Sequence, residues 1–112
     1  ESKRLPFAQA ATGAIGVETL LPLSLEMYHN DSLPLNKIIE TLTINPAKIL
    51  KIKKGSLAKE SDGDICIFDL EVPWVVQADK LKSKSKNTAI EGRKLQGKVL
   101  MTFLNGHLAF KQ

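Results

Sequence analysis

The first half of the chain carries apolar residues at helical spacing. Residues 17–28 place an apolar or small side chain at every third or fourth position, and a second stripe of this kind follows Pro34. Thr19 is a candidate cap for the first helix, and Pro22 then falls in the first turn, where a missing amide is tolerated. Asn45-Pro46 predicts a third, short helix, because Asn is a favoured cap and Pro suits the first helical position. The two stripes are Val17, Leu20, Leu21, Ser24, Leu25 and Tyr28, and Leu35, Ile38, Ile39 and Leu42.

Beyond Gly55 the pattern changes to extended structure. Residues 64–69 carry apolar side chains on both faces, which is typical of a central, buried strand. Asn105-Gly106 predicts a tight hairpin turn between two further strands. The helical and extended parts share no obvious apolar face, and the pattern changes near residue 52. The expected elements of the second part are strands at 64–69, 73–76, 96–104 and 107–110, and a lysine-rich loop at 77–94 with one helical turn near 78–81.

Length and composition describe an ordinary globular segment. The chain has 112 residues, of which 43% are hydrophobic and 25% charged, so it forms one domain or a piece of a larger one. No apolar run approaches the roughly 20 residues that span a bilayer, and no signal-peptide pattern is visible, so we expect no membrane partner. Because the chain opens on Glu1 rather than Met, we expect it to begin inside a longer gene product.

Charge and cysteine content narrow the classes of partner. Sixteen Lys and Arg against twelve Asp and Glu give a net charge of +4. The lysine clusters at 51–54 and 80–86 contain none of the aromatic or arginine side chains that a nucleic-acid surface would set among them, so we expect no nucleic-acid partner. The single cysteine, Cys66, can form no intrachain disulfide, which is typical of a reducing cytoplasm. We therefore expect a cytoplasmic protein.

Candidate catalytic and metal-binding side chains are scattered along the chain. His29 and His107 lie in different halves without a neighbouring His, and Cys66 on an apolar strand is expected to be a small core residue. Asp62-Gly63-Asp64 is too short for a calcium loop and is expected to be a turn entering a strand. Glu18 lies near a helix start, where capping is favoured over a role as an ion-pair partner or a base. The residue inventory alone contains no complete catalytic constellation.

A glycine-punctuated segment precedes the first helix. Residues 6–16 are mostly small and apolar, and Gly13 and Gly16 suit a positive φ or a close approach of the backbone to another group. These residues allow two interpretations: an N-terminal arm packed on a core, or a loop whose amides face a ligand.

Several short motifs follow one another along almost the whole chain. They are Lys3-x-x-Pro6-Phe7, Ala10-x-x-Gly13-x-x-Gly16-x-Glu18-Thr19-x-x-Pro22-Leu23, Thr43-x-Asn45-Pro46-Ala47-x-x-Leu50, Gly55-x-Leu57, Asp64-Ile65-x-Ile67-Phe68-Asp69, Ser83-Lys84-Ser85-Lys86-Asn87-Thr88, Glu91-Gly92, Leu95-x-Gly97-x-Val99 and Asn105-Gly106. This series resembles the C-terminal third of class I dihydroorotases, in the amidohydrolase superfamily. Two positions depart from the usual pattern, because Ala89-Ile90 replaces a Pro-Phe pair and Gly63 stands where Ala is common.

The resemblance implies a fold and an activity. The fold is an α+β fragment, in which residues 1–51 would be the active-site loop and terminal helices of a (β/α)8 TIM barrel. Residues 52–112 would be the C-terminal part of the flanking β-sandwich. The implied activity is the reversible ring opening and closure of dihydroorotate to N-carbamoyl-aspartate in de novo pyrimidine biosynthesis, with zinc as the cofactor. The substrate-binding pair would be Thr12 and Gly13, acting through backbone groups.

The same resemblance implies that the metal site lies outside this chain. The family's ligands include a His-x-His pair, two further histidines and the Asp of an Asp-His-Ala-Pro-His motif, and neither motif occurs here. We therefore expect no catalytic or metal-ligating residue in the chain, no bound zinc and no activity of the chain alone. The expected partners are dihydroorotate, the remainder of the same protein, a second copy in a homodimer, and aspartate transcarbamoylase.

Two alternative functions remain open. One is a dihydroorotase-like protein without metals that serves as a structural partner of aspartate transcarbamoylase. The other is a sister cyclic amidohydrolase, such as an allantoinase or a hydantoinase, although the segment from Pro6-Phe7 to Gly13 argues against it. The histidines of the missing upstream part would decide between the enzyme and the metal-free partner.

Overall fold

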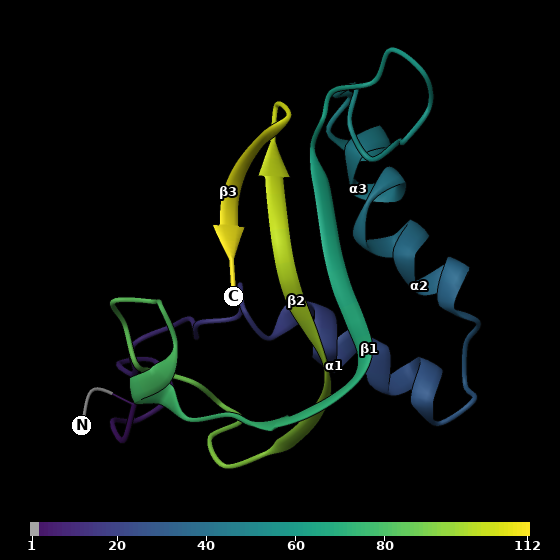
Figure 1. Ribbon diagram of the computed structural model, residues 1–112. Coiled ribbons are helices and arrows are strands. Elements are labelled where there is room, and N and C mark those ends of the chain that lie inside the picture. Colours follow the sequence, from purple (N-terminus) through teal and green to yellow (C-terminus); the bar gives the residue numbers. More distant parts are fainter. Residues whose placement is uncertain (1–2) are drawn as a thin grey trace.

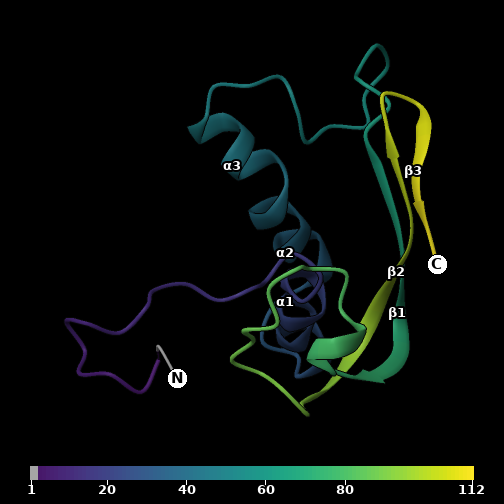
Figure 2. The same cartoon turned by 90° about the vertical axis from the view of Figure 1, so that its left-hand side faces the viewer.

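Three α-helices lie on one side of a three-stranded antiparallel sheet in the computed structural model, which describes residues 3–112 (Figure 1). Figure 2 shows the sheet edge-on, with the helices toward one of its faces. The strand order is β1-β2-β3, so β2 is central. The predicted α+β arrangement is confirmed. The elements are α1 (Leu20–His29), α2 (Leu35–Leu42), α3 (Ile44–Ile49), β1 (Ile65–Val75), η1 (Ala78–Lys80), β2 (Lys94–Leu104) and β3 (His107–Lys111).

The helices form where the sequence pattern predicts them. α1 begins directly after Thr19, and Pro22 lies in its first turn. The Thr19 hydroxyl does not cap the helix, because it donates to the Gly16 carbonyl at 3.2 Å instead. α3 begins two residues earlier than predicted, at Ile44 rather than Pro46, so Asn45 lies inside the helix and Thr43 takes the cap position. The predicted helical turn in the lysine-rich loop is present as η1.

β1 is one long strand rather than the two predicted extended pieces. Asp69 pairs with Lys98 and Pro73 pairs with Gln96, so three residues of β1 face a single residue of β2 between these pairs. This bulge accommodates a proline within the strand, because the irregular segment lacks a regular ladder of amide bonds. The predicted Asn105-Gly106 turn joins β2 to β3, with φ angles of 50° and 78°.

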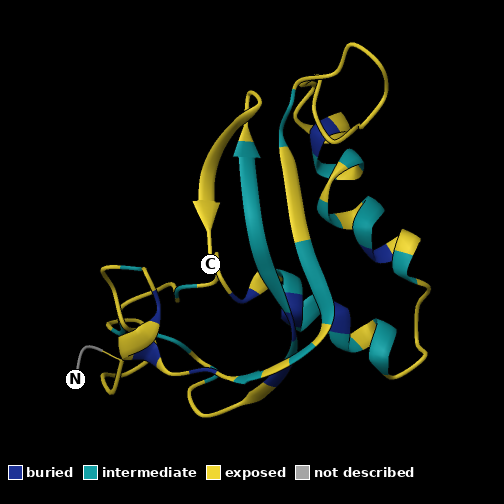
Figure 3. Ribbon diagram, viewed as in Figure 1, coloured by how far each residue is buried: buried dark blue, intermediate teal, exposed yellow. Residues whose placement is uncertain are grey.

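β1 is an edge strand, and the prediction that its first half is central and buried is wrong. Among the described residues β1 pairs with β2 alone, and α1 packs against β2 rather than over the start of β1. The Ile65 and Ile67 side chains are 41% and 42% exposed, and Cys66 between them is also exposed. Cys66 is therefore not the core residue that the apolar run predicts. Figure 3 shows the exposed start of β1 beside the half-buried β2.

α1 joins the sheet at Gly97 of β2. Leu25 is fully buried there, and a Cβ atom added to Gly97 would lie 2.5 Å from the Leu25 Cδ1 atom. Gly97 has a φ of +104°, and its carbonyl accepts a hydrogen bond from Trp74 Nε1 at 2.9 Å. The helical and β parts therefore share a buried face that the sequence pattern did not predict. A second buried cluster consists of Val76, Leu81 and Leu95, with Ile15, Leu23, Trp74 and Ile90 packed against it.

An ion-paired latch holds the tip of the β2–β3 hairpin. The Lys54 ammonium lies 2.8 Å from a carboxylate oxygen of Asp62 and 2.5 Å from one of Asp64. The other Asp64 oxygen and the Gly63 carbonyl accept the two backbone amides of the Asn105-Gly106 turn, at 2.8 and 2.9 Å. Residues 62–64 therefore form a turn that enters β1, as predicted, and this turn also fastens the hairpin.

Many large apolar side chains of the described residues remain exposed. The radius of gyration is 16.2 Å, whereas about 13 Å is typical of a compact domain of this length. These side chains lie on the helices, the loops and the sheet, so the apolar residues are not gathered in a single closed core. Those more than half exposed are Phe7, Val17, Leu20, Ile49, Leu50, Leu57, Leu104 and Leu108.

The Gly97→Ala substitution should destabilise the fold. The new methyl group would collide with Leu25, and a side chain at this φ is strained, so we expect a loss of about 1–3 kcal/mol in the free energy of unfolding. Urea titration followed by Trp74 fluorescence measures the loss. Gly16→Ala is the matched control, because a methyl group at Gly16 would meet no atom within 4 Å. Equal unfolding midpoints for the two variants would contradict the tight contact.

The contribution of the latch to the free energy of unfolding should fall at both acidic and alkaline pH. The Lys54 ammonium, followed by the Asn105 amide, lowers the pKa of Asp64, whereas the Asp62 and Asp64 carboxylates raise the pKa of Lys54. A carboxylate with a lowered folded pKa adds stability above its unfolded pKa of 3.8, and this stability is lost as the pH falls through the folded value. The contribution of Lys54 is present below pH 10.5 and is lost as the pH rises through its folded pKa.

We therefore expect Asp64→Asn to lower the free energy of unfolding at about pH 7 more than at about pH 2, where the wild-type carboxylate is itself protonated. The effect should be small and weakened by salt, because the pair is solvent-exposed. Denaturant titrations at the two pH values measure it. Glu60→Gln, which changes an exposed carboxylate in the preceding loop, is the control. An equal difference at both pH values would argue against the latch.

Candidate functional site

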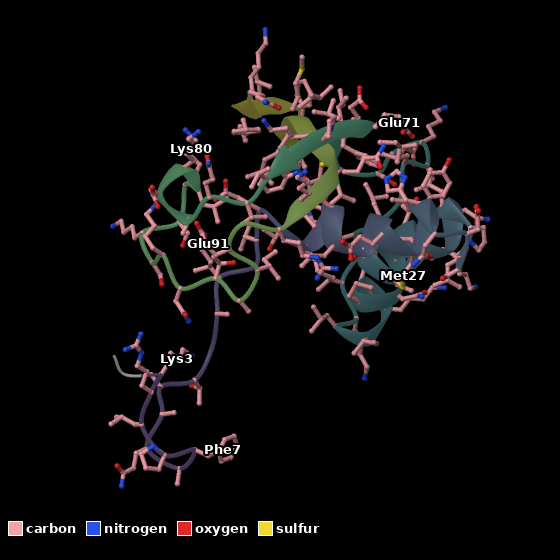
Figure 4. All side chains as sticks on the ribbon, turned by 90° about the horizontal axis from the view of Figure 1, so that it is seen from below. Lys3, Phe7, Met27, Glu71, Lys80 and Glu91 are labelled. Atoms are coloured by element: carbon pink, nitrogen blue, oxygen red, sulfur yellow. The ribbon has the colours of Figure 1, made fainter. Side chains whose placement is uncertain are left out.

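The loop that carries Thr12 and Gly13 follows an N-terminal segment that extends away from the body of the molecule (Figure 4). Lys3 and Phe7 lie on this segment, and the Phe7 side chain is fully exposed. Residues 11–14 are exposed as well. Residues 11–14 therefore are not packed on the core of the described residues, and the interpretation of a loop that faces a ligand stays a prediction.

Gly13 forms a bend in which its carbonyl is already engaged. Its φ is +81°, and no atom of residues 3–112 lies within 4 Å of the position that a Cβ atom would take. The carbonyl accepts the Lys3 ammonium at 2.6 Å and the Asn87 side-chain amide at 2.8 Å. The backbone amides of Thr12, Gly13 and Ala14, in contrast, donate to no acceptor within residues 3–112. The Ala11 amide has no acceptor among these residues either, so residues 11–14 present backbone donors of the kind that carbonyl or carboxylate oxygens accept.

Asn87 binds the loop on both sides of Ala14. Its side-chain amide donates to the Gly13 carbonyl, and its backbone carbonyl accepts the Ile15 amide at 2.9 Å. The Ile15 side chain also packs against the buried cluster around Leu81. Sequence reasoning missed this role of Asn87, because its partner Gly13 is 74 residues away and a polar residue in a polar loop carries no local signal.

Glu18 caps a different segment from the one predicted. One of its carboxylate oxygens accepts the backbone amides of Lys82 and Ser83, at 2.7 and 3.3 Å, rather than an amide of α1. The Gly16 carbonyl already accepts the Thr19 and Leu20 amides at the start of α1, which leaves Glu18 free to reach across. Its two bonds therefore join the start of α1 to the lysine-rich loop.

Two cavities lie beside this loop. The smaller has a volume of about 170 Å³ and is lined by residues 14–19, Leu81 and Ser83. The larger has a volume of about 690 Å³, which falls within the range of roughly 300–1,000 Å³ typical of ligand pockets. Thr12 and Gly13 line neither of these two cavities, and both residues are exposed. The lining of the larger cavity includes Trp74, Lys80, Lys82, Lys98 and Phe110.

The family of the chain follows from its similarity to known proteins. The family model described as "Amidohydrolase family" matches residues 8–109. The chain belongs to the amidohydrolase family. Among curated proteins, Dihydroorotase from Ehrlichia chaffeensis is 46% identical over 110 residues, which are 98% of this chain and 25% of the relative. The resemblance to dihydroorotases drawn from the motifs is therefore confirmed.

Solved structures of amidohydrolases share the fold of the chain. A D-hydantoinase structure is 26% identical, with a TM-score of 0.88 over 99% of this chain and 25% of the other. L-hydantoinase (dihydropyrimidinase) from Arthrobacter aurescens is 30% identical, with a TM-score of 0.85 over 93% of this chain and 24% of the other. The chain thus spans about a quarter of the length of the proteins it matches, and the expected α+β fragment is confirmed.

The described part of this amidohydrolase-family chain does not fit a metal site. It contains no group of three or more His, Cys, Asp or Glu side chains that could hold a metal ion. His29 ends α1 and lies edge-to-face on Tyr28, with 5.2 Å between ring centroids, whereas His107 is exposed at the start of β3. Desolvation raises the pKa of the Cys66 thiol against the opposing hydrogen bond of Thr102, which disfavours the thiolate that a metal binds. No helix in residues 3–112 is long and apolar enough to cross a membrane.

We expect the purified 112-residue chain to retain no stoichiometric zinc. Its isolated histidines and protonated thiol lack the three or four converging ligands that zinc requires. Dialysis against buffered zinc, followed by elemental analysis of the protein, measures the uptake. A full equivalent that disappears in the His29→Ala or His107→Ala variant would contradict this reading of the ligand inventory.

Proposed function

We propose that this chain is part of a zinc-dependent dihydroorotase, which opens and closes the ring of dihydroorotate in de novo pyrimidine biosynthesis. The observation that carries the proposal is the 46% identity with a protein named Dihydroorotase across 98% of the chain. Zinc and the proton-transferring Asp belong, in this proposal, to parts of the protein outside this chain. The chain alone is inactive, and its site contribution is the loop at Thr12 and Gly13.

The chemistry of the substrate suits the free donors of that loop. Hydrolysis of the ring amide adds one water molecule to dihydroorotate and yields N-carbamoyl-aspartate. Dihydroorotate carries ring carbonyl oxygens and a carboxylate, all of which accept hydrogen bonds. The unpaired amides at residues 12–14 are donors that need no particular side chain, so they can orient these oxygens through the backbone alone.

The remainder of the protein is the first proposed partner. Exposed apolar side chains lie on the helices and along the sheet, and the chain covers a quarter of the length of its relatives. Packing of the missing part against these side chains would remove their apolar area from water. In this proposal residues 1–51 complete a TIM barrel and residues 52–112 join a flanking β-sandwich. The cytoplasmic location, a homodimer and an association with aspartate transcarbamoylase stay predictions.

A hydantoinase is the second candidate, and the likeness to the two hydantoinase structures favours it. The two activities differ in substrate, because hydantoin lacks the ring carboxylate of dihydroorotate. The full-length protein that carries this chain should therefore be assayed with both substrates after loading with zinc. A kcat/KM for dihydroorotate at least about tenfold above that for hydantoin, a difference of about 1.4 kcal/mol in transition-state binding, supports the first proposal. The reverse ratio supports a hydantoinase.

Gly13→Val should damage turnover of the full-length enzyme far more than its stability. A branched side chain at a φ of +81° would shift the loop backbone, while the open space around Gly13 leaves the core untouched. We expect kcat/KM for dihydroorotate to fall by about 100-fold with little change in the unfolding midpoint. Gly16→Ala, also in open space but without a positive φ, is the control and should stay near wild type. Normal kinetics of the Gly13→Val variant would contradict the proposal that this loop contributes to the substrate site.

A further inference from the structure

The proposed substrate loop is held by hydrogen bonds more than by packing. A Cβ atom at Gly13 or Gly16 would meet nothing within 4 Å in the described part of the chain, and residues 11–14 are exposed. Ile15 alone of residues 10–16 packs against the buried cluster. A loop that presents backbone donors must nevertheless stand in one position, because a displaced donor no longer meets the oxygen it should bind. Some group outside the loop must therefore fix it.

We propose that Asn87 positions the substrate loop, through one bond from its side chain and one to its backbone, beside the Lys3 ammonium that donates to the same Gly13 carbonyl. This inference rests on the proposed function. The side-chain amide donates to Gly13 at 2.8 Å, and the Asn87 carbonyl accepts the amide of Ile15 at 2.9 Å. The two bonds straddle Ala14, so they fix both the place and the tilt of the segment that carries the free amides.

Asn87 can do this because its own segment is tied to the body of the protein. The Lys86 ammonium donates to the carbonyl of Leu81 at 2.7 Å, and Leu81 is buried in the cluster below the loop. The Glu18 carboxylate holds the amides at 82 and 83, at the other end of the same segment. The segment that carries Asn87 is therefore connected to the core through Leu81 and to the start of α1 through Glu18.

The chemistry of an amide side chain fits this position. A backbone carbonyl such as that of Gly13 only accepts hydrogen bonds, so the group facing it must donate. Leucine has nearly the shape of asparagine but no donor, so Asn87→Leu removes the bond with little change in volume. The loop would then occupy its binding-competent position for a smaller fraction of the time. The apparent dissociation constant of the substrate rises as this fraction falls.

The test uses the full-length protein with dihydroorotate as substrate. We expect Asn87→Leu to raise KM about fivefold to tenfold, from the loss of one hydrogen bond, with kcat within about twofold of wild type and an unchanged unfolding midpoint. Cleavage within residues 6–16 by a nonspecific protease should accelerate by a similar factor. Asn36→Leu, the same change at an exposed position of α2, should leave both measurements unchanged.

Two results would overturn the role of Asn87. One is an unchanged rate of loop cleavage together with an unchanged KM. The other is a fall in kcat that parallels a fall in the unfolding midpoint, which would mean a general structural role. The cleavage assay needs no substrate, so it decides whether Asn87 anchors the loop even if the wild-type protein does not act on dihydroorotate. A wild-type protein without that activity would overturn the proposed function instead.

Discussion

The absence of a side chain at Gly97 is the constraint on which the arrangement of the two halves depends. Leu25 lies so close to the backbone of β2 that a Cβ atom at Gly97 would be 2.5 Å from its Cδ1 atom, so a side chain at this position would push α1 away from the sheet. The Trp74 indole bonds to the carbonyl of the same glycine, and the ion pair of Arg93 with Glu26, at 2.8 Å, lies further along α1. Because α1 is rigid, its seat on β2 also fixes where its first residue stands, and with it the loop that precedes the helix.

Local signals predicted the elements, and they failed where burial depends on distant neighbours. The helical stripes, the proline in the first turn of α1 and the Asn105-Gly106 turn act within a few residues, so their sequence reveals them. An apolar run such as residues 65–68 indicates only that a strand formed by these residues would be stable if it were buried. Whether it is buried depends on which strands and helices lie beside it, and within residues 3–112 β1 has one neighbouring strand. The exposure of Cys66 follows from the same cause.

The candidate loop was predictable in part for the same reason. A glycine at position 13 indicates an unusual backbone conformation, because glycine adopts a positive φ readily, and the structure gives Gly13 a positive φ. Asn87 and Glu18 have no such signature, because asparagine and glutamate are common in polar loops and at helix starts. Their partners lie 74 and about 65 residues away, and only the packing of α1 on the sheet brings these segments together. A contact of this kind follows from the fold rather than from the motif.

The loop also explains why a site can depend on residues that carry little chemistry of their own. The donors of the proposed site are backbone amides, so the small side chains around Gly13 would matter mainly by leaving these amides accessible. Backbone donors cannot adjust by changing a side-chain rotamer, and their direction is only as constant as the chain that holds them. The direction of these donors therefore depends on the residues that hold the loop in place. In the proposed site, three side chains give this support. Lys3 and Asn87 donate to the Gly13 carbonyl, and Glu18 joins the start of α1 to the segment that carries Asn87.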